Sequence, residues 1–185
     1  DIDRSRGLGD VYKRQTSSLP KGAPAMISVA GTGVARRSQV VLRSGGRPGD
    51  LLFVTGKLGG SQGGRHLTFI PRLEEADWLS RNFRIHAMMD LSDGLAMDLP
   101  RLASASGCGF RLERSALPRS RGATVEEALR DGEDYELLFA ISERSSPKLL
   151  AEWAERFPRL KLTSIGALSP EGTEGLLGGW DHFRE

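Results

Sequence analysis

Short apolar runs that alternate with stretches of helical spacing constrain this chain more than any other feature. The apolar runs predict five strands, at 51–56, 85–90, 109–113, 135–141 and 161–168. The helical spacing predicts helices near 62–68, 72–82, 95–106, 124–130 and 146–157. Weaker patterns predict further strands at 25–35 and 174–178. This interleaving predicts an α+β fold, an α/β sandwich in which helices pack on a mixed sheet.

Size and charge exclude several classes of protein. The 185 residues, 38% of them hydrophobic, can form one substantial domain and part of another. A net charge of +2 gives no argument for binding nucleic acid, and no apolar run approaches the roughly 20 residues that a membrane-spanning helix needs. The single cysteine, Cys108, excludes an internal disulfide. Because no secretory signal is visible, we expect a cytoplasmic protein.

Composition also predicts how the chain is divided. Residues 1–15 follow neither the helical nor the strand period, and we expect them to be a non-native leader, with the native protein beginning upstream of Thr16. The segment RSGGRPGD, residues 43–50, has the composition of a linker. We therefore predict a C-terminal domain over 46–185, with 16–45 as the end of an earlier domain and its connection.

A glycine-rich loop follows the first strand of that domain. GKLGGSQGG, residues 56–64, stands between a strand and a helix, where backbone amides can meet phosphate oxygens. However, a Walker loop carries Lys and then Ser or Thr after its last glycine, whereas here Lys57 opens the loop and Leu58 follows it. We therefore interpret these glycines as serving a tight turn.

An acidic turn is the strongest chemical signal in the sequence. In HAMMDLSDGLAMDLPRL, residues 86–102, Asp90 ends a buried strand and Ser92 and Asp93 follow it. Mg²⁺ in phosphate-transferring sites is often held by one or two carboxylates, with water and phosphates as its other ligands. The alternative is that Ser92 or Asp93 caps the next helix, and the pattern alone leaves both open. Asp98 is expected to face solvent or to cap a helix.

Two other motifs have a plain interpretation and a functional one. DGEDYELLF, residues 131–139, is either a solvated acidic turn before a strand or a place where an acid contacts a cationic substrate. In the C-terminal GGWDHFRE, Trp180 either anchors the tail or stacks on a heteroaromatic ligand. The three histidines are dispersed and predict neither a catalytic triad nor a metal site.

Taken in order, RSGGRPGDLLFVTGKLGGS, IHAMMDLSDGLAMDLPRLASASGCG, DGEDYELLF and GWDHF resemble the thiamine-monophosphate kinases, within the aminoimidazole ribonucleotide synthetase superfamily. The resemblance runs from Thr16 to the end of the chain. It implies that residues 16–45 derive from an N-terminal ATP-binding domain. It also implies an ATP- and Mg²⁺-dependent enzyme that converts thiamine monophosphate into thiamine diphosphate by direct in-line transfer, acting as a homodimer without nucleic acid or membrane partners.

The resemblance also implies roles for particular residues, none of them a catalytic nucleophile. It assigns metal binding to Asp90 and Asp93, ATP contacts to Arg43 and Ser92, and thiamine-phosphate contacts to Glu133 and Trp180.

One departure limits the match. The family carries Gly-Gly-Asp directly before the segment that matches Thr16, and here Arg14 or Gln15 stands where its metal-binding aspartate belongs. We therefore expect a kinase fragment that is inactive alone. The alternatives are a non-catalytic ligand-binding fragment, or a sister enzyme of the superfamily that acts on another phosphate acceptor.

Overall fold

The computed structural model describes residues 30–34 and 36–170, apart from the side chains of Ser38 and Gln62. Contacts divide the chain into two units, residues 1–34 and 35–185. In the first unit, the described residues 30–34 are exposed and form neither helix nor strand. The predicted strand at 174–178 and Trp180 lie outside the described residues, as does most of the predicted strand at 25–35.

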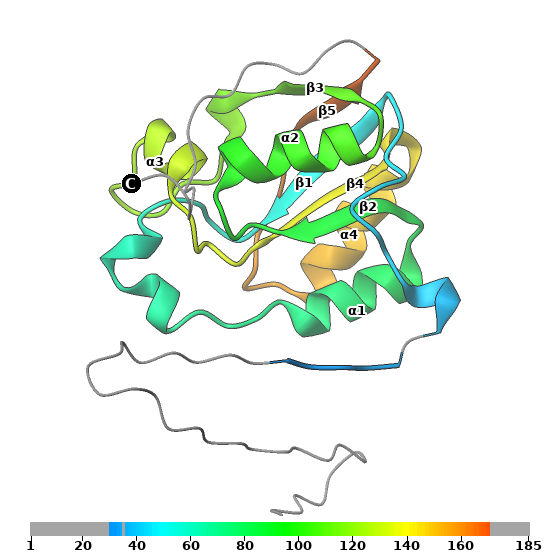
Figure 1. Cartoon of the computed structure of the whole chain (residues 1–185), viewed down its shortest axis with the longest axis horizontal. Helices are drawn as coiled ribbons and strands as arrows, with labels where there is room; N and C mark the ends of the chain where they lie inside the picture. The colour runs from blue at the N-terminus through cyan, green and yellow to red at the C-terminus, as the bar shows by residue number, and fades with distance from the viewer. Residues whose placement is uncertain (1–29, 35, 171–185) are drawn as a thin grey trace, which may run out of the picture. The chain divides into compact units, whose positions relative to one another are not determined.

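A five-stranded sheet organises the second unit, in the order β2-β4-β1-β5-β3 (Figure 1). Its strands are β1 (Asp50–Thr55), β2 (Ile85–Asp90), β3 (Gly109–Leu112), β4 (Leu137–Ser142) and β5 (Leu162–Ser169). Every pairing of these strands is antiparallel. The α+β class is therefore confirmed, and the described sheet is antiparallel where the sequence predicted a mixed one. Alternating helices and strands along the sequence do not determine strand direction. The connection from β1 to β2 leaves room for one strand between them, and the antiparallel β4 fills that place.

Within residues 36–170, four α-helices accompany the sheet: α1 (Leu73–Asn82), α2 (Leu95–Ala105), α3 (Val125–Arg130) and α4 (Ser146–Arg156). Their starts follow local sequence, since Thr124 forms a capping box with Glu127 and Pro147 stands in the first turn of α4. The stretch predicted to be helical near 62–68 forms two 3₁₀ turns instead, Ser61–Gly63 and Arg65–Leu67. Glycines on both sides of the first turn prevent a longer helix.

Strand alternation sends side chains to two hydrophobic cores, one on each face of the sheet. Leu52 and Val54 of β1 join the core that α2 and α3 cover, whereas Phe53 joins the core that α1 and α4 cover. Figure 1 shows α2 across one face and α4 on the other. The unit is thus a three-layer sandwich. No helix within the described residues is long and apolar enough to cross a membrane.

Candidate functional site

Three chemically distinctive segments meet at one end of the sheet. β4 runs antiparallel to both β1 and β2, so Leu137 at its start lies beside Asp90 at the end of β2 and close to the end of β1. The acidic turn at 90–94, the segment 131–136 and the glycine loop at 56–64 therefore leave the sheet at the same end.

Asp98 on α2 holds the acidic turn in place through hydrogen bonds. One carboxylate oxygen of Asp98 accepts hydrogen bonds from the backbone amides of Ser92 and Asp93, both at 3.0 Å. Asp98 is fully buried, so the expectation that it faces solvent was wrong. Burial raises the pKa of Asp98, while hydrogen bonds from the Asp93 amide and from Arg101 oppose that rise. Asp98 therefore fixes the path of the turn that carries the predicted metal ligands.

The two predicted metal ligands have different surroundings. Asp90 is exposed at the end of β2, and its side chain forms no ion pair with any residue that the structure describes. The half-buried Asp93 pairs with Arg101, which also donates to Asp98 at 2.9 Å. Two carboxylates are thus held near one turn, and Arg101 offsets part of their mutual repulsion.

The segment 131–136 binds directly to the acidic turn. The amide of Glu133 donates to the carbonyl of Ser92 at 2.7 Å, and the amide of Tyr135 donates to the carbonyl of Leu91 at 2.8 Å. The structure therefore brings Glu133 next to Asp90, Ser92 and Asp93, which lie some 40 residues earlier in the sequence.

Glycine is required where the two segments approach most closely. Gly94 has a φ of +94°, and a Cβ atom there would lie 2.8 Å from the carbonyl oxygen of Asp131. Glu133 and Tyr135 adopt left-handed backbone conformations, with φ of 64° and 51°. Burial raises the pKa of Tyr135, and so do the nearby carboxylates of Glu133, Asp90 and Asp93. The phenol thus lies in the electrostatic field of the predicted site.

Two buried carboxylates hold this conformation. Asp134 is 4% exposed, accepts from the Gly59 amide at 3.1 Å and pairs with Arg65. Burial raises its pKa to about 7, against the lowering effect of the Gly59 amide and of Arg65. Glu136 is 3% exposed and accepts two hydrogen bonds from Arg72, both at 2.8 Å. The interpretation of DGEDYELLF as a solvated turn was therefore wrong for these two acids.

The glycine loop uses its amides on these carboxylates. Gly59 donates to Asp134, and Gly60 donates to Asp131 at 2.6 Å. A Cβ atom on Gly56 would lie 2.2 Å from a carboxylate oxygen of Glu136. The amides of Gly59 and Gly60 are therefore engaged in hydrogen bonds within the fold. This agrees with the interpretation that the glycines of the loop serve a tight turn.

Comparison with protein families identifies the fold. Residues 55–177 match the model of the AIR synthase related protein, C-terminal domain, which is more than half of the chain. The chain belongs to this family.

Relatives of this AIR synthase related chain include thiamine-monophosphate kinases. That of Rhodopirellula baltica is 42% identical in an alignment 126 positions long, which covers 63% of this chain and 40% of the relative. That of Leptospira interrogans is 36% identical in an alignment 148 positions long, which covers 67% of this chain and 46% of the relative. The chain thus spans about half the length of the curated relatives it matches, and it is similar to their C-terminal portion.

Solved structures agree with this relation. The thiamine-monophosphate kinase of Stenotrophomonas maltophilia has a TM-score of 0.67 at 26% identity, covering 76% of this chain and 55% of that one. A structure described as AaThiL complexed with AMPPCP and TMP has a TM-score of 0.59 at 31% identity, covering 77% and 54%. At 17% identity and a TM-score of 0.60, a Thermotoga maritima PurL structure shares the fold.

Arg43 has no contact with the acidic turn in the described part of this AIR synthase related domain. Arg43 is exposed beside β2, where the neighbouring Leu42 carbonyl accepts from the Met88 amide at 2.9 Å. Trp180 is outside the described residues. The assigned roles of both residues remain predictions.

Sequence reasoning missed the residues that organise the site, chiefly Asp98, Arg101 and Asp134. A signal existed for Asp98, because it stands three residues after Leu95 and four before Leu102, on the apolar face of α2. An acid on such a face must find donors. No comparable pattern marks Arg65 as the partner of Asp134, because their contact joins residues 69 positions apart.

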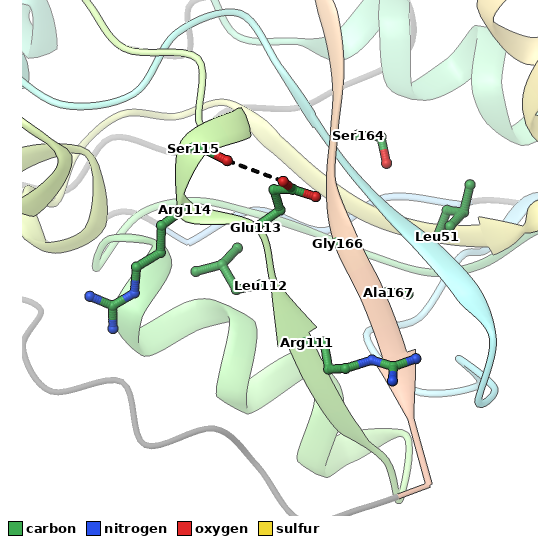
Figure 2. A pocket seen from close by; sticks show the side chains of 9 residues that line it. All are labelled: Leu51, Arg111, Leu112, Glu113, Arg114, Ser115, Ser164, Gly166 and Ala167. Atoms are coloured by element: carbon green, nitrogen blue, oxygen red, sulfur yellow. Dashed lines mark hydrogen bonds between the residues drawn. The ribbon is translucent and has the colours of Figure 1, made fainter.

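A hollow lined only by described residues of this AIR synthase related domain lies away from the acidic turn. It has a volume of about 1040 Å³ and is lined by β5, by the end of β3 and by the 3₁₀ turn Arg114–Ala116. Figure 2 shows Arg111 and Glu113 on its rim, with a hydrogen bond from Ser115 to Glu113. None of the predicted site residues lines it, so we do not place the functional site there.

Proposed function

We propose that this chain is the C-terminal part of an enzyme that phosphorylates thiamine monophosphate to thiamine diphosphate, with ATP and Mg²⁺. The observation that carries the proposal is the 2.7 Å hydrogen bond from the Glu133 amide to the Ser92 carbonyl. It joins a turn suited to metal-bound phosphate to an acid suited to a cationic substrate. The names of the relatives and the AMPPCP and TMP complex support the same reaction.

The residues present suit a shared magnesium site. No group of three or more His, Cys, Asp or Glu residues that could hold a metal exists in the described part of the chain. Asp90 and Asp93 offer two carboxylates, which suits an ion that takes its remaining ligands from water and phosphates. Bound Mg²⁺ would neutralise charge on the phosphates during transfer. The exposed Asp90 is accessible to such an ion. Asp93 would give up part of its contact with Arg101 in order to bind the ion.

The protein groups act by positioning rather than by covalent participation. Phosphoryl transfer depends on alignment and charge stabilisation, and both need a rigid turn. Asp98 supplies that rigidity by holding two successive amides of the turn. Arg43 and Ser92 are the proposed ATP contacts, and Glu133 and Trp180 the proposed contacts of thiamine monophosphate. Direct in-line transfer requires no enzyme nucleophile at this turn.

Association and location belong to the same proposal. By its relation to the kinases we infer a homodimer in the cytoplasm, with ATP and thiamine monophosphate as its small-molecule ligands.

The proposal is tested by assaying formation of thiamine diphosphate from ATP and thiamine monophosphate with Mg²⁺. Two proteins are compared: the 185-residue chain, and residues 43–185 joined to the N-terminal portion of the R. baltica kinase. We expect turnover by the joined protein, reduced at least tenfold by Asp93→Asn. Full activity of that variant would contradict the metal role of Asp93. Turnover by the 185-residue chain alone would contradict our expectation that it is inactive.

A further inference from the structure

A cluster of basic side chains surrounds a second pocket at the same end of the sheet. The pocket has a volume of about 370 Å³. Six of its lining residues are cationic, and its one carboxylate is Glu136. None of Asp90, Ser92, Asp93 or Glu133 lines it, so it is separate from the acidic turn.

Two of the six cations are already neutralised. Arg72 forms two hydrogen bonds with Glu136, and Arg65 pairs with Asp134. The remaining four, Lys57, Arg121, Arg159 and Lys161, are exposed, and none forms an ion pair with a residue that the structure describes. An unpaired cluster of this kind leaves a strongly positive potential inside a concave surface.

The backbone brings these cations together from three separate segments. The Gly56 amide donates to the Lys161 carbonyl at 2.8 Å, which places the end of β1 beside the start of β5. The amide of Leu58 donates to Pro118 at 2.7 Å, and that of Ser120 donates to Leu58 at 2.9 Å. The loop that carries Arg121 is therefore fixed next to Lys57. Since the convergence depends on backbone hydrogen bonds, it persists when no anion is present.

Exposed basic residues ordinarily belong to a solvated surface. On the α-helices that the structure describes, basic residues pair with acids. Arg81 pairs with Asp77 on α1, and Lys148 lies 3.6 Å from Glu152 on α4. Each of these helical cations has an acid one turn away. The four remaining pocket cations instead have no acid paired with them among the described residues, so their mutual repulsion favours a bound anion.

We propose that this pocket binds a ligand with linked phosphate groups, at a site distinct from the metal-binding turn. Four unpaired cations match the charge of a diphosphate, and arginine suits phosphate because its donors form a planar fork. A neighbouring hollow of about 640 Å³ shares Lys57, Ser120 and Lys161 with the pocket and adds Arg119. That continuity leaves space for the rest of a phosphorylated molecule.

Calorimetric titration of the 185-residue chain with inorganic diphosphate, without divalent metal, tests the proposal. We expect binding that weakens at least tenfold in Arg159→Gln/Lys161→Gln. The matched control is Arg84→Gln/Arg144→Gln, which removes two exposed cations at the opposite end of the sheet and should stay within twofold. Equal binding by both variants, equal loss in both, or no binding by the unchanged chain would overturn the proposal.

Further arms separate the sources of the signal. Lys57→Gln/Arg121→Gln removes the other two cations and should also weaken binding at least tenfold, which covers the case in which the first variant does not fold. Asp90→Asn/Asp93→Asn should keep diphosphate binding, because it alters the acidic turn alone. Loss of binding in that variant would move the anion to the turn and overturn the separate site. A titration with ATP, also without metal, distinguishes a nucleotide ligand from free diphosphate. If the nucleoside contributes to binding, ATP binds more tightly than diphosphate.

Discussion

At the residue scale, buried carboxylates decide the form of the site. Asp98 and Asp134 accept backbone amides of the acidic turn and of the glycine loop, respectively. Each also contacts an arginine, so neither is left as an isolated buried charge. The acids that the sequence marks as ligands, the exposed Asp90 and the half-buried Asp93 and Glu133, are therefore positioned by acids that are buried.

Asp134 should make stability depend on pH in a definite direction. Its pKa rises from 3.8 to about 7 in the fold, so the folded state binds the proton more tightly than the unfolded state. The contribution of Asp134 is therefore fully present below pH 3.8 and is lost as pH rises through about 7. For one proton, the slope is at most about 1.4 kcal/mol per pH unit.

The measurement is the free energy of unfolding of the unchanged chain and of Asp134→Asn between pH 5 and pH 8, by urea denaturation. We expect the difference between them, unchanged minus variant, to fall as pH rises, because the asparagine does not titrate. A difference that is constant over this range, or that grows with pH, would contradict the assigned environment of Asp134.

At the element scale, the glycine loop and the acidic segment are fitted to each other. The sequence predicted β2 with its observed bounds, and it predicted α1 and α4 to within one residue at each end, because their apolar periods are clear. It did not predict the burial of Asp134 and Glu136. That burial depends on Gly56, Gly59 and two arginines from distant parts of the chain, which no local period records.

Gly56→Ala tests this fit between elements. Gly56 has a φ of +60°, and its Cβ would overlap Glu136, whereas Gly122 has a φ of +84° with nothing within 4 Å. Both substitutions carry left-handed strain of about 1–2 kcal/mol. We expect Gly56→Ala to cost about 1–3 kcal/mol more than Gly122→Ala, measured as free energy of unfolding in urea. Equal losses in the two variants would show that the Glu136 contact does not constrain Gly56.

At the scale of the whole molecule, the sandwich places oppositely charged surfaces at one end of its sheet. The acidic turn with Glu133 forms one, and the pocket around Lys57 and Lys161 forms the other. The order of the four motifs along the sequence was enough to single out the acidic turn as a candidate site. It could not predict the basic pocket, because Lys57 and Lys161 become neighbours only when β1 and β5 pair, and Arg121 joins them through backbone hydrogen bonds of Leu58.

The central claim is that Asp90 and Asp93 hold the metal of a metal–ATP complex. Its most direct test is electron paramagnetic resonance titration with Mn²⁺, in place of Mg²⁺, in the presence of ATP, on residues 43–185 joined to the N-terminal portion of the R. baltica kinase. Asp90→Asn/Asp93→Asn is compared with Asp77→Asn/Glu113→Gln, which removes two exposed acids elsewhere. The account predicts at least tenfold weaker Mn²⁺ binding in the first variant and unchanged binding in the second. Equal affinity in the two variants, or no Mn²⁺ binding by the unchanged joined protein, would contradict it.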